Sequence, residues 1–171
     1  MLGLAALVLA AASVNASPST TSVSPWWERI TWTFSGDGAQ QSCKFESSLD
    51  GRTACDREDE SGPTISGGSG SAGSYTKITV ERRFTPAGRP DRVSLQSGDT
   101  MLGGQIIALA IGTDGAVRSC RIIGASGDVQ PPYGCREARA ERFDASAGRE
   151  TPEVRQAFMT VVVYGHEEYL A

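Results

Sequence analysis

Residues 105–123 read QIIALAIGTDGAVRSCRII, and this stretch carries the strongest local signal in the chain. Two apolar runs flank the dipeptide Asp114-Gly115, a pattern typical of a β-hairpin because Asp-Gly readily adopts the positive φ angles of a tight turn. The stretch therefore predicts two antiparallel strands joined at this dipeptide.

A second stretch repeats the pattern 77 residues earlier, which indicates an internal duplication. Ile30 corresponds to Ile107, and the sequences DGA at 37–39 and SC at 42–43 recur at 114–116 and 119–120. Cys55 and Cys135 also correspond once three residues are allowed for. The alternative is two unrelated hairpins that share ordinary turn chemistry.

The composition is that of a globular protein, with 39% hydrophobic and 21% charged residues among 171. The net charge is -4 and the isoelectric point is about 5.0. Binding to nucleic acid or to an anionic membrane needs an excess of clustered lysine and arginine. We therefore expect no nucleic-acid partner.

Residues 1–16 read MLGLAALVLAAASVNA, an uncharged apolar run that ends in small residues. This pattern predicts a secretory signal peptide cleaved after Ala16. The alternative, a membrane anchor, needs about 20 apolar residues, more than this run provides. We expect an exported protein without a stable membrane span after cleavage.

Four cysteines, at 43, 55, 120 and 135, suit an exported protein with disulfide bonds, and four cysteines allow three connectivities. Zinc is the alternative use of cysteine. It is disfavoured because the chain has no C-x-x-C sequence and its single histidine, His166, has no partner at ligand spacing. No metal site is predicted.

Breaks in composition divide the chain into segments. Residues 26–60 predict a first β-hairpin module, with Ile30, Trp32 and Phe34 on one face of its first strand. The remaining segments are a flexible lead at 17–25, a Gly/Ser linker at 61–74, an additional β-hairpin at 75–102 and a second module at 103–171. The linker contains a G-x-G-x-x-G string at 68–73 but has neither the strand nor the helix that nucleotide binding requires, so no cofactor is predicted.

The second module continues beyond its hairpin. Residues 136–143 are rich in alanine, arginine and glutamate and predict a short helix, and residues 154–164 end in an apolar, β-branched run that predicts a buried or paired strand. In residues 75–102, an arginine cluster indicates either a solvated strand face with cross-strand charge pairs or an anion-binding groove; its members are Arg82, Arg83, Arg89 and Arg92.

Candidates for catalysis are few. Two carboxylate pairs, Asp114 with Asp128 and Glu137 with Glu141, could perform acid/base chemistry only if burial raised one pKa of a pair. Their settings, in turns and on a helix surface, argue against that. We assign no catalytic residue and expect a protein that is not an enzyme, with a small secreted hydrolase as the alternative.

With these elements placed, residues 104–164 resemble the TonB C-terminal domain family. The similarity lies in IIALAIGTDGAVRSCRIIGASGD, CREARAERFDASAGR and VVVY, and is closest to cysteine-bearing variants from Gram-negative bacteria. It implies an α+β protein of two small hairpin-based modules, the second β-β-α-β with an antiparallel sheet. With the repeat, it implies local disulfides, Cys43 with Cys55 and Cys120 with Cys135.

The resemblance also implies a place and a role. Members of the family commonly act in the periplasm, where they bind envelope or outer-membrane proteins by adding a strand at a sheet edge. This chain lacks an uncleaved anchor and a Pro-rich spacer, so we expect a periplasmic or secreted interaction module that is not an anchored energy transducer. A structural envelope protein without a ligand is a further alternative. The predicted binding edge consists of Phe158, Thr160, Val162 and Tyr164.

Overall fold

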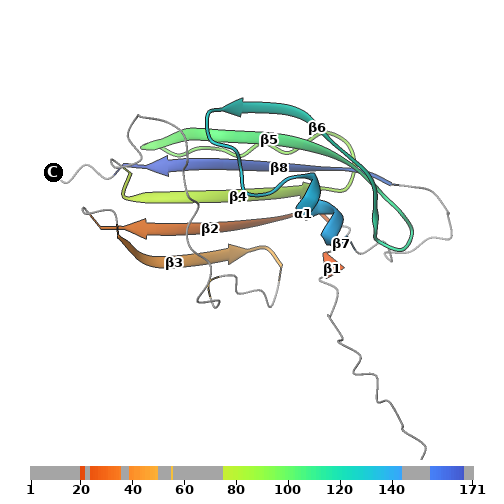
Figure 1. Ribbon diagram of the computed structural model, residues 1–171, viewed down its shortest axis with the longest axis horizontal. Helices are drawn as coiled ribbons and strands as arrows, with labels where there is room; N and C mark the ends of the chain where they lie inside the picture. The colour runs from red at the N-terminus through yellow and green to blue at the C-terminus, as the bar shows by residue number, and fades with distance from the viewer. Residues whose placement is uncertain are drawn as a thin grey trace, which may run out of the picture.

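The structure is a computed structural model that describes residues 20–21, 24–35, 39–49, 55, 75–143 and 155–167. The strands are β1 (Thr20–Thr21), β2 (Trp26–Phe34), β3 (Gln40–Ser47), β4 (Lys77–Thr85), β5 (Asp99–Ile111), β6 (Val117–Gly127), β7 (Arg142–Phe143) and β8 (Arg155–His166). One six-stranded sheet has the order β3–β2–β4–β8–β5–β6, with all neighbours antiparallel (Figure 1). Strands β1 and β7 form a small parallel pair.

The predicted α+β class, with two separate modules of which the second is β-β-α-β, is wrong. The structure is β-rich: in the described ranges the only helix is α1 (Cys135–Ala140), and strands from both predicted modules join one sheet. The two halves meet where β4 pairs with β8 along its length. The apolar run of β8 is buried on both faces. A central position in the sheet gives its backbone hydrogen-bonding partners on both sides and removes its apolar side chains from water.

The hairpin predicted from residues 105–123 is confirmed, since β5 and β6 pair antiparallel on either side of the Asp114-Gly115 turn. Gly115 has a φ of 77°, and its N–H donates to the carbonyl of Gly112 at 2.9 Å. A side chain at this position would also lie only 2.1 Å from the carbonyl oxygen of Phe143. Glycine is therefore required here by both conformation and space.

The additional hairpin predicted at 75–102 is wrong in its second half. Strand β4 forms as expected, but residues 91–96 form no strand, because β2 and β8 already occupy both edges of β4. Residues 91–93 instead run over one face of the sheet. There the carbonyl of Asp91 accepts a hydrogen bond from Thr160 Oγ1 at 2.7 Å.

The helix predicted at 136–143 is shorter than expected, since α1 ends at Ala140 and β7 follows. Phe143 is buried, its ring stacks on that of Phe84 with centroids 5.1 Å apart, and its N–H donates to the carbonyl of Gly115. An extended backbone brings Phe143 into the core at this point, which a continued helix turn would not do.

The sheet has two different faces. The inner face carries Ile107, Met159 and Val163, all fully buried, and packs against α1 through Ala138. The outer face carries alternate residues of the same strands, among them Ile106, which pairs with Thr160. The core therefore lies on the inner face of the sheet, where Ala138 of α1 joins it.

The hairpins β2–β3 and β5–β6 pair in the same register at Ile30 and Ile107. Ile30 lies opposite Phe45 and Val80, while Ile107 lies opposite Ile122 and Met159. Each hairpin has a register shift at the same place, between Thr33 and Phe34 and between Ala110 and Ile111. The common origin of the two halves stays a prediction.

The two local disulfides are confirmed. Cys43 bonds to Cys55 and Cys120 to Cys135, with Cα atoms 5.8 and 5.6 Å apart. The predicted signal peptide (1–16) and Gly/Ser linker (61–74) lie outside the described residues, as does most of the predicted lead at 17–25. No helix in the described ranges combines the length and apolar character needed to cross a membrane.

Candidate functional site

The predicted binding edge is wrong in its location. Phe158, Thr160, Val162 and Tyr164 lie on β8, which pairs with β4 on one side and β5 on the other. No outward row of backbone groups is left on such a strand for a partner to pair with. The four side chains instead alternate along the outer face, where two of them take part in the candidate site described next.

Strand β6 is an edge of the sheet. Across the described part of the chain its only strand partner is β5, so its other side carries unpaired backbone groups. Most of its residues are exposed, including Ile122 and Ile123, each with 45% of its surface accessible. The Cys120–Cys135 bond holds the strand to α1 from the inner face. A strand edge with exposed isoleucines is a ready template for pairing.

Two β-bulges divide β6. Ile106 pairs with Gly124 and Ile107 with Ile122, so Ile123 has no partner; Arg118 is left out in the same way between Val117 and Ser119. A bulge bends a strand and interrupts regular pairing. Regular outward geometry is thus confined to Ser119–Ile122 and to the residues after Ile123, which restricts the register of any added strand.

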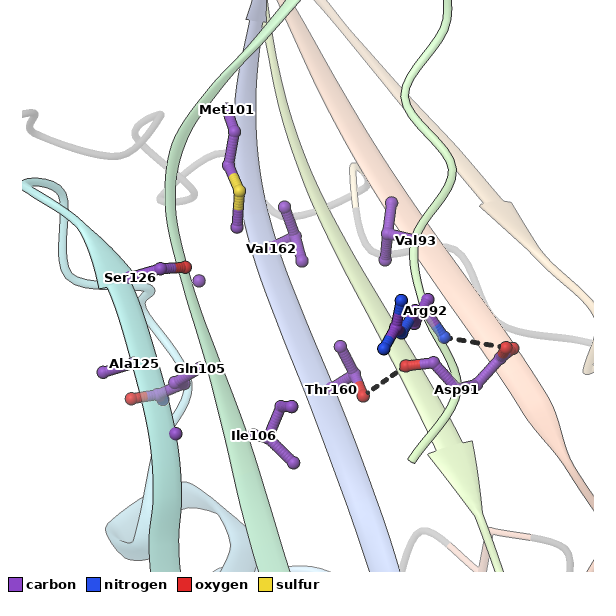
Figure 2. A pocket seen from close by; sticks show the side chains of 12 residues that line it. Asp91, Arg92, Val93, Met101, Gln105, Ile106, Ala125, Ser126, Thr160 and Val162 are labelled. Carbon is purple, nitrogen blue, oxygen red and sulfur yellow. Dashed lines mark hydrogen bonds between the residues drawn. The ribbon is translucent and has the colours of Figure 1, made fainter. Parts of the chain in front are cut away.

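A groove of about 340 Å³ lies on the outer face beside β6. Figure 2 shows Ile106, Thr160 and Val162 on its floor, with residues 91–93 on one side and the end of β6 on the other. The complete lining is Asp91, Arg92, Val93, Met101, Gly104, Gln105, Ile106, Gly124, Ala125, Ser126, Thr160 and Val162. Small residues on the β6 side leave the groove open toward the sheet edge.

The wall formed by residues 91–93 is held by a buried carboxylate network. Glu81, only 1% exposed, accepts hydrogen bonds from Arg29 Nε at 3.0 Å, from Arg83 Nε at 2.6 Å and from the Tyr164 hydroxyl at 3.2 Å. Arg83 also bonds to the Asp91 carboxylate at 2.9 Å, and this bond lowers the pKa of Asp91 despite its partial burial. The groove wall is therefore fixed to the sheet.

The arginines near β4 and the groove divide into those that pair with carboxylates and those that form no ion pair. Arg82 and Arg83 point to opposite faces of β4 and pair with carboxylates, of which Glu28 lies directly across the strand from Arg82. The cross-strand charge pair is confirmed for Arg82, whereas Arg83 binds Glu81 on its own strand. Both arginine side chains are mostly buried and do not form a solvated face. Arg92, in the groove lining, and Arg121, on β6, form no ion pair with any described residue and are exposed.

The carboxylate pairs are not brought together as acid and base. Asp114 lies in the hairpin turn and Asp128 follows the far end of β6, so the length of a strand separates them. The N–H of Ala116 lowers the pKa of Asp114, the opposite of what a general acid needs. Glu137 binds the N–H of Gly134, and Glu141 binds Arg82. Within the described ranges, no cluster of side chains is suited to hold a metal.

Sequence reasoning could not find the groove, because its lining comes from four separate segments of the chain. A usable signal was the exposed pair Ile122 and Ile123, which follows Cys120 and breaks the alternation of β6. The sequence pattern predicts these residues as the second strand of a hairpin and does not show which strand lies at the edge of the sheet.

No protein-family model, no curated protein and no solved structure matches the chain. The edge strand, the groove and the charges beside them are therefore the features that bear on function.

Tyr164 gives an alkaline signature of the Glu81 network. Burial, then the nearby Glu81 carboxylate, raise the pKa of Tyr164 to about 12, against the effect of Arg29. An unfolded tyrosine ionises at about pH 10. Folded Tyr164 therefore keeps its proton to a higher pH than unfolded Tyr164. The contribution of Tyr164 to the free energy of unfolding is constant below about pH 10 and falls as the pH rises toward 12. Urea unfolding at pH 9, 10 and 11 should show this fall, with a shallower pH dependence in Tyr164→Phe; equal slopes would contradict the assignment.

Proposed function

We propose that the protein is an exported interaction module of the cell envelope that binds an extended segment of a partner protein along the outer edge of β6. The observation that carries the proposal is the open side of β6, with Ile122 and Ile123 exposed along it. In strand addition, backbone hydrogen bonds supply affinity and side-chain pockets supply specificity. A groove beside the same strand provides such a pocket.

The opposite edge, β3, is a weaker candidate. Charged side chains are a common way to protect an edge strand from pairing. Lys44 and Glu46 form an ion pair of 3.0 Å on β3, and by the 77-residue correspondence Glu46 occupies the place of Ile123. The exposed edge that carries isoleucine in place of glutamate is β6, so the proposal assigns binding to β6.

The periplasm of a Gram-negative bacterium is the proposed location. Two disulfides indicate an oxidising compartment, and residues 1–16 have the pattern of a signal peptide. The sequence resemblance of residues 104–164 to TonB C-terminal domains motivates an envelope or outer-membrane protein as the partner. The module is proposed to act as a binding unit and not as an energy transducer.

Peptide selection tests the proposal. Phage-displayed peptides are selected on the oxidised protein, and the affinities of the winners are then measured by fluorescence anisotropy. We expect Ile123→Glu, which gives β6 the charge found at the same position of β3, to weaken binding at least tenfold, about 1.4 kcal/mol. The matched control Lys44→Glu, at the β3 position that corresponds to Arg121, should change affinity by less than about twofold, within the effect of a remote surface charge.

Hydrogen exchange supplies the second readout. An added strand pairs with outward amides, so bound peptide should slow exchange within residues 119–122 and leave residues 42–47 unchanged. Protection confined to β3, or selected peptides that bind the Ile123→Glu variant as well as the unaltered protein, would show that β6 is not the binding edge.

A further inference from the structure

The groove beside β6 has a composition that defines a ligand. We infer that it receives one large apolar side chain of the bound segment, and that an acidic residue two positions away in the same segment faces Arg121. This inference rests on the proposed function. The partner would then carry an acidic and a large apolar residue separated by a single residue.

Two polar groups of the groove floor and wall, at Thr160 and Asp91, are already used within the protein. Thr160 Oγ1 donates to the carbonyl of Asp91, and the Asp91 carboxylate is bound by Arg83. The remaining contact surface near the floor is provided by Ile106, Val162 and Met101. With Thr160 and Asp91 satisfied, the floor of the groove offers mainly apolar contact area, so it selects an apolar side chain.

The groove is within reach of a strand added to β6. Neighbouring strands lie about 4.8 Å apart, and a long side chain can contact residues diagonally opposite on the neighbouring strand. The β6 wall consists of Gly124, Ala125 and Ser126, so no bulky side chain stands between the edge and the groove. A Cβ atom at Gly124 would meet only Ile106, at 3.8 Å, which leaves this passage open.

The charges beside the groove indicate the neighbouring residue. Arg121 pairs across the hairpin with Ala108, and Gly124 pairs with Ile106, so the two are successive outer-face positions of β6. Arg121 and Arg92 are exposed and form no ion pair with any described residue, in a protein whose net charge is -4. Local positive charge beside an apolar groove favours a segment with an acidic residue next to its apolar anchor. Successive outer-face positions of the added strand are two residues apart.

Designed peptides test the spacing. The probes are nine-residue acetylated, amidated peptides with glutamate and phenylalanine separated by one residue in a Ser/Thr background, made in both orders to allow parallel and antiparallel pairing. Matched peptides carry alanine in place of phenylalanine, or glutamine in place of glutamate. In one of the two orders we expect the phenylalanine peptide to bind at least tenfold more tightly than its alanine counterpart, and the glutamate peptide more tightly than its glutamine counterpart.

Two variants locate the contacts. Gly124→Leu should remove the preference for phenylalanine because it fills the passage, and Arg121→Gln should remove the preference for glutamate while Lys44→Gln on β3 retains both. Near-ultraviolet circular dichroism and the melting temperature report folding, and Gly124→Ala replaces Gly124→Leu if the larger side chain prevents folding. Gly124→Ala should then reduce the preference for phenylalanine.

Each outcome separates the inference from the proposed function. Designed peptides that fail to bind, show no phenylalanine preference, or keep that preference in folded Gly124 variants would overturn the inference. The proposed function would still stand if phage-selected peptides protect residues 119–122 from exchange. If no selected peptide protects those residues, the proposed function fails as well.

Discussion

Replacing Arg82 with leucine should lower the free energy of unfolding by about 3–5 kcal/mol, the usual result of removing one partner from a buried ion cluster. Arg82 donates to Glu28 at 2.6 Å and to Glu141 at 2.6 Å, and its guanidinium lies over the rings of Trp26 and Tyr133. Burial alone would lower the pKa of Arg82, but Glu141 and Glu28 raise it above its ordinary value. Without the arginine, two carboxylates would remain largely buried and uncompensated.

Urea unfolding at pH 7 measures the effect. Arg89→Leu is the matched control, because Arg89 is exposed and its loss should change stability by less than about 0.5 kcal/mol. Adding Glu28→Gln and Glu141→Gln to the Arg82 variant removes both uncompensated charges and should recover part of the loss. A loss below about 1 kcal/mol for Arg82→Leu alone would contradict a desolvated cluster.

The elements that could be predicted depend on neighbours in sequence. Asp114-Gly115 specifies its turn locally, and the alternation in β2 specifies which side chains share a face. The partner of β4 could not be read from the chain in the same way. The expected return strand at 91–96 has no apolar alternation strong enough to exclude other partners, and the pairing with β8 joins residues about 80 positions apart. Sheet order is a long-range property that turn chemistry does not determine.

The same limit applies to the candidate site. The apolar run of β8 was compatible with an edge or with the centre of a sheet, and only the pairing with both β4 and β5 decides between them. The disulfides were predictable because the 77-residue correspondence in the sequence places each second cysteine after its own hairpin. The exposed edge could not be predicted from the sequence, because the exposure of β6 depends on the lack of a neighbouring strand and not on its own residues.

The final prediction concerns the two disulfides, which should differ in function more than in stability. Removing Cys120–Cys135 with Cys120→Ala and Cys135→Ala should lower the free energy of unfolding by about 3 kcal/mol, because the bond closes a short loop in the unfolded chain. The cysteines of this bond are 15 residues apart and those of Cys43–Cys55 are 12 apart, so their loop-closure contributions should be similar.

Peptide affinity separates the two bonds. Cys120 lies within β6, and its bond to α1 fixes the strand that we propose as the binding edge. Without it, a partner would have to order β6 on binding, which reduces affinity. We therefore expect weaker binding, by tenfold or more, after loss of Cys120–Cys135, and a change of less than about threefold, below 1 kcal/mol, after loss of Cys43–Cys55. Anisotropy titrations at a temperature where both variants are folded provide the measurement. Equal weakening by the two changes would mean that affinity follows global stability and not the order of β6.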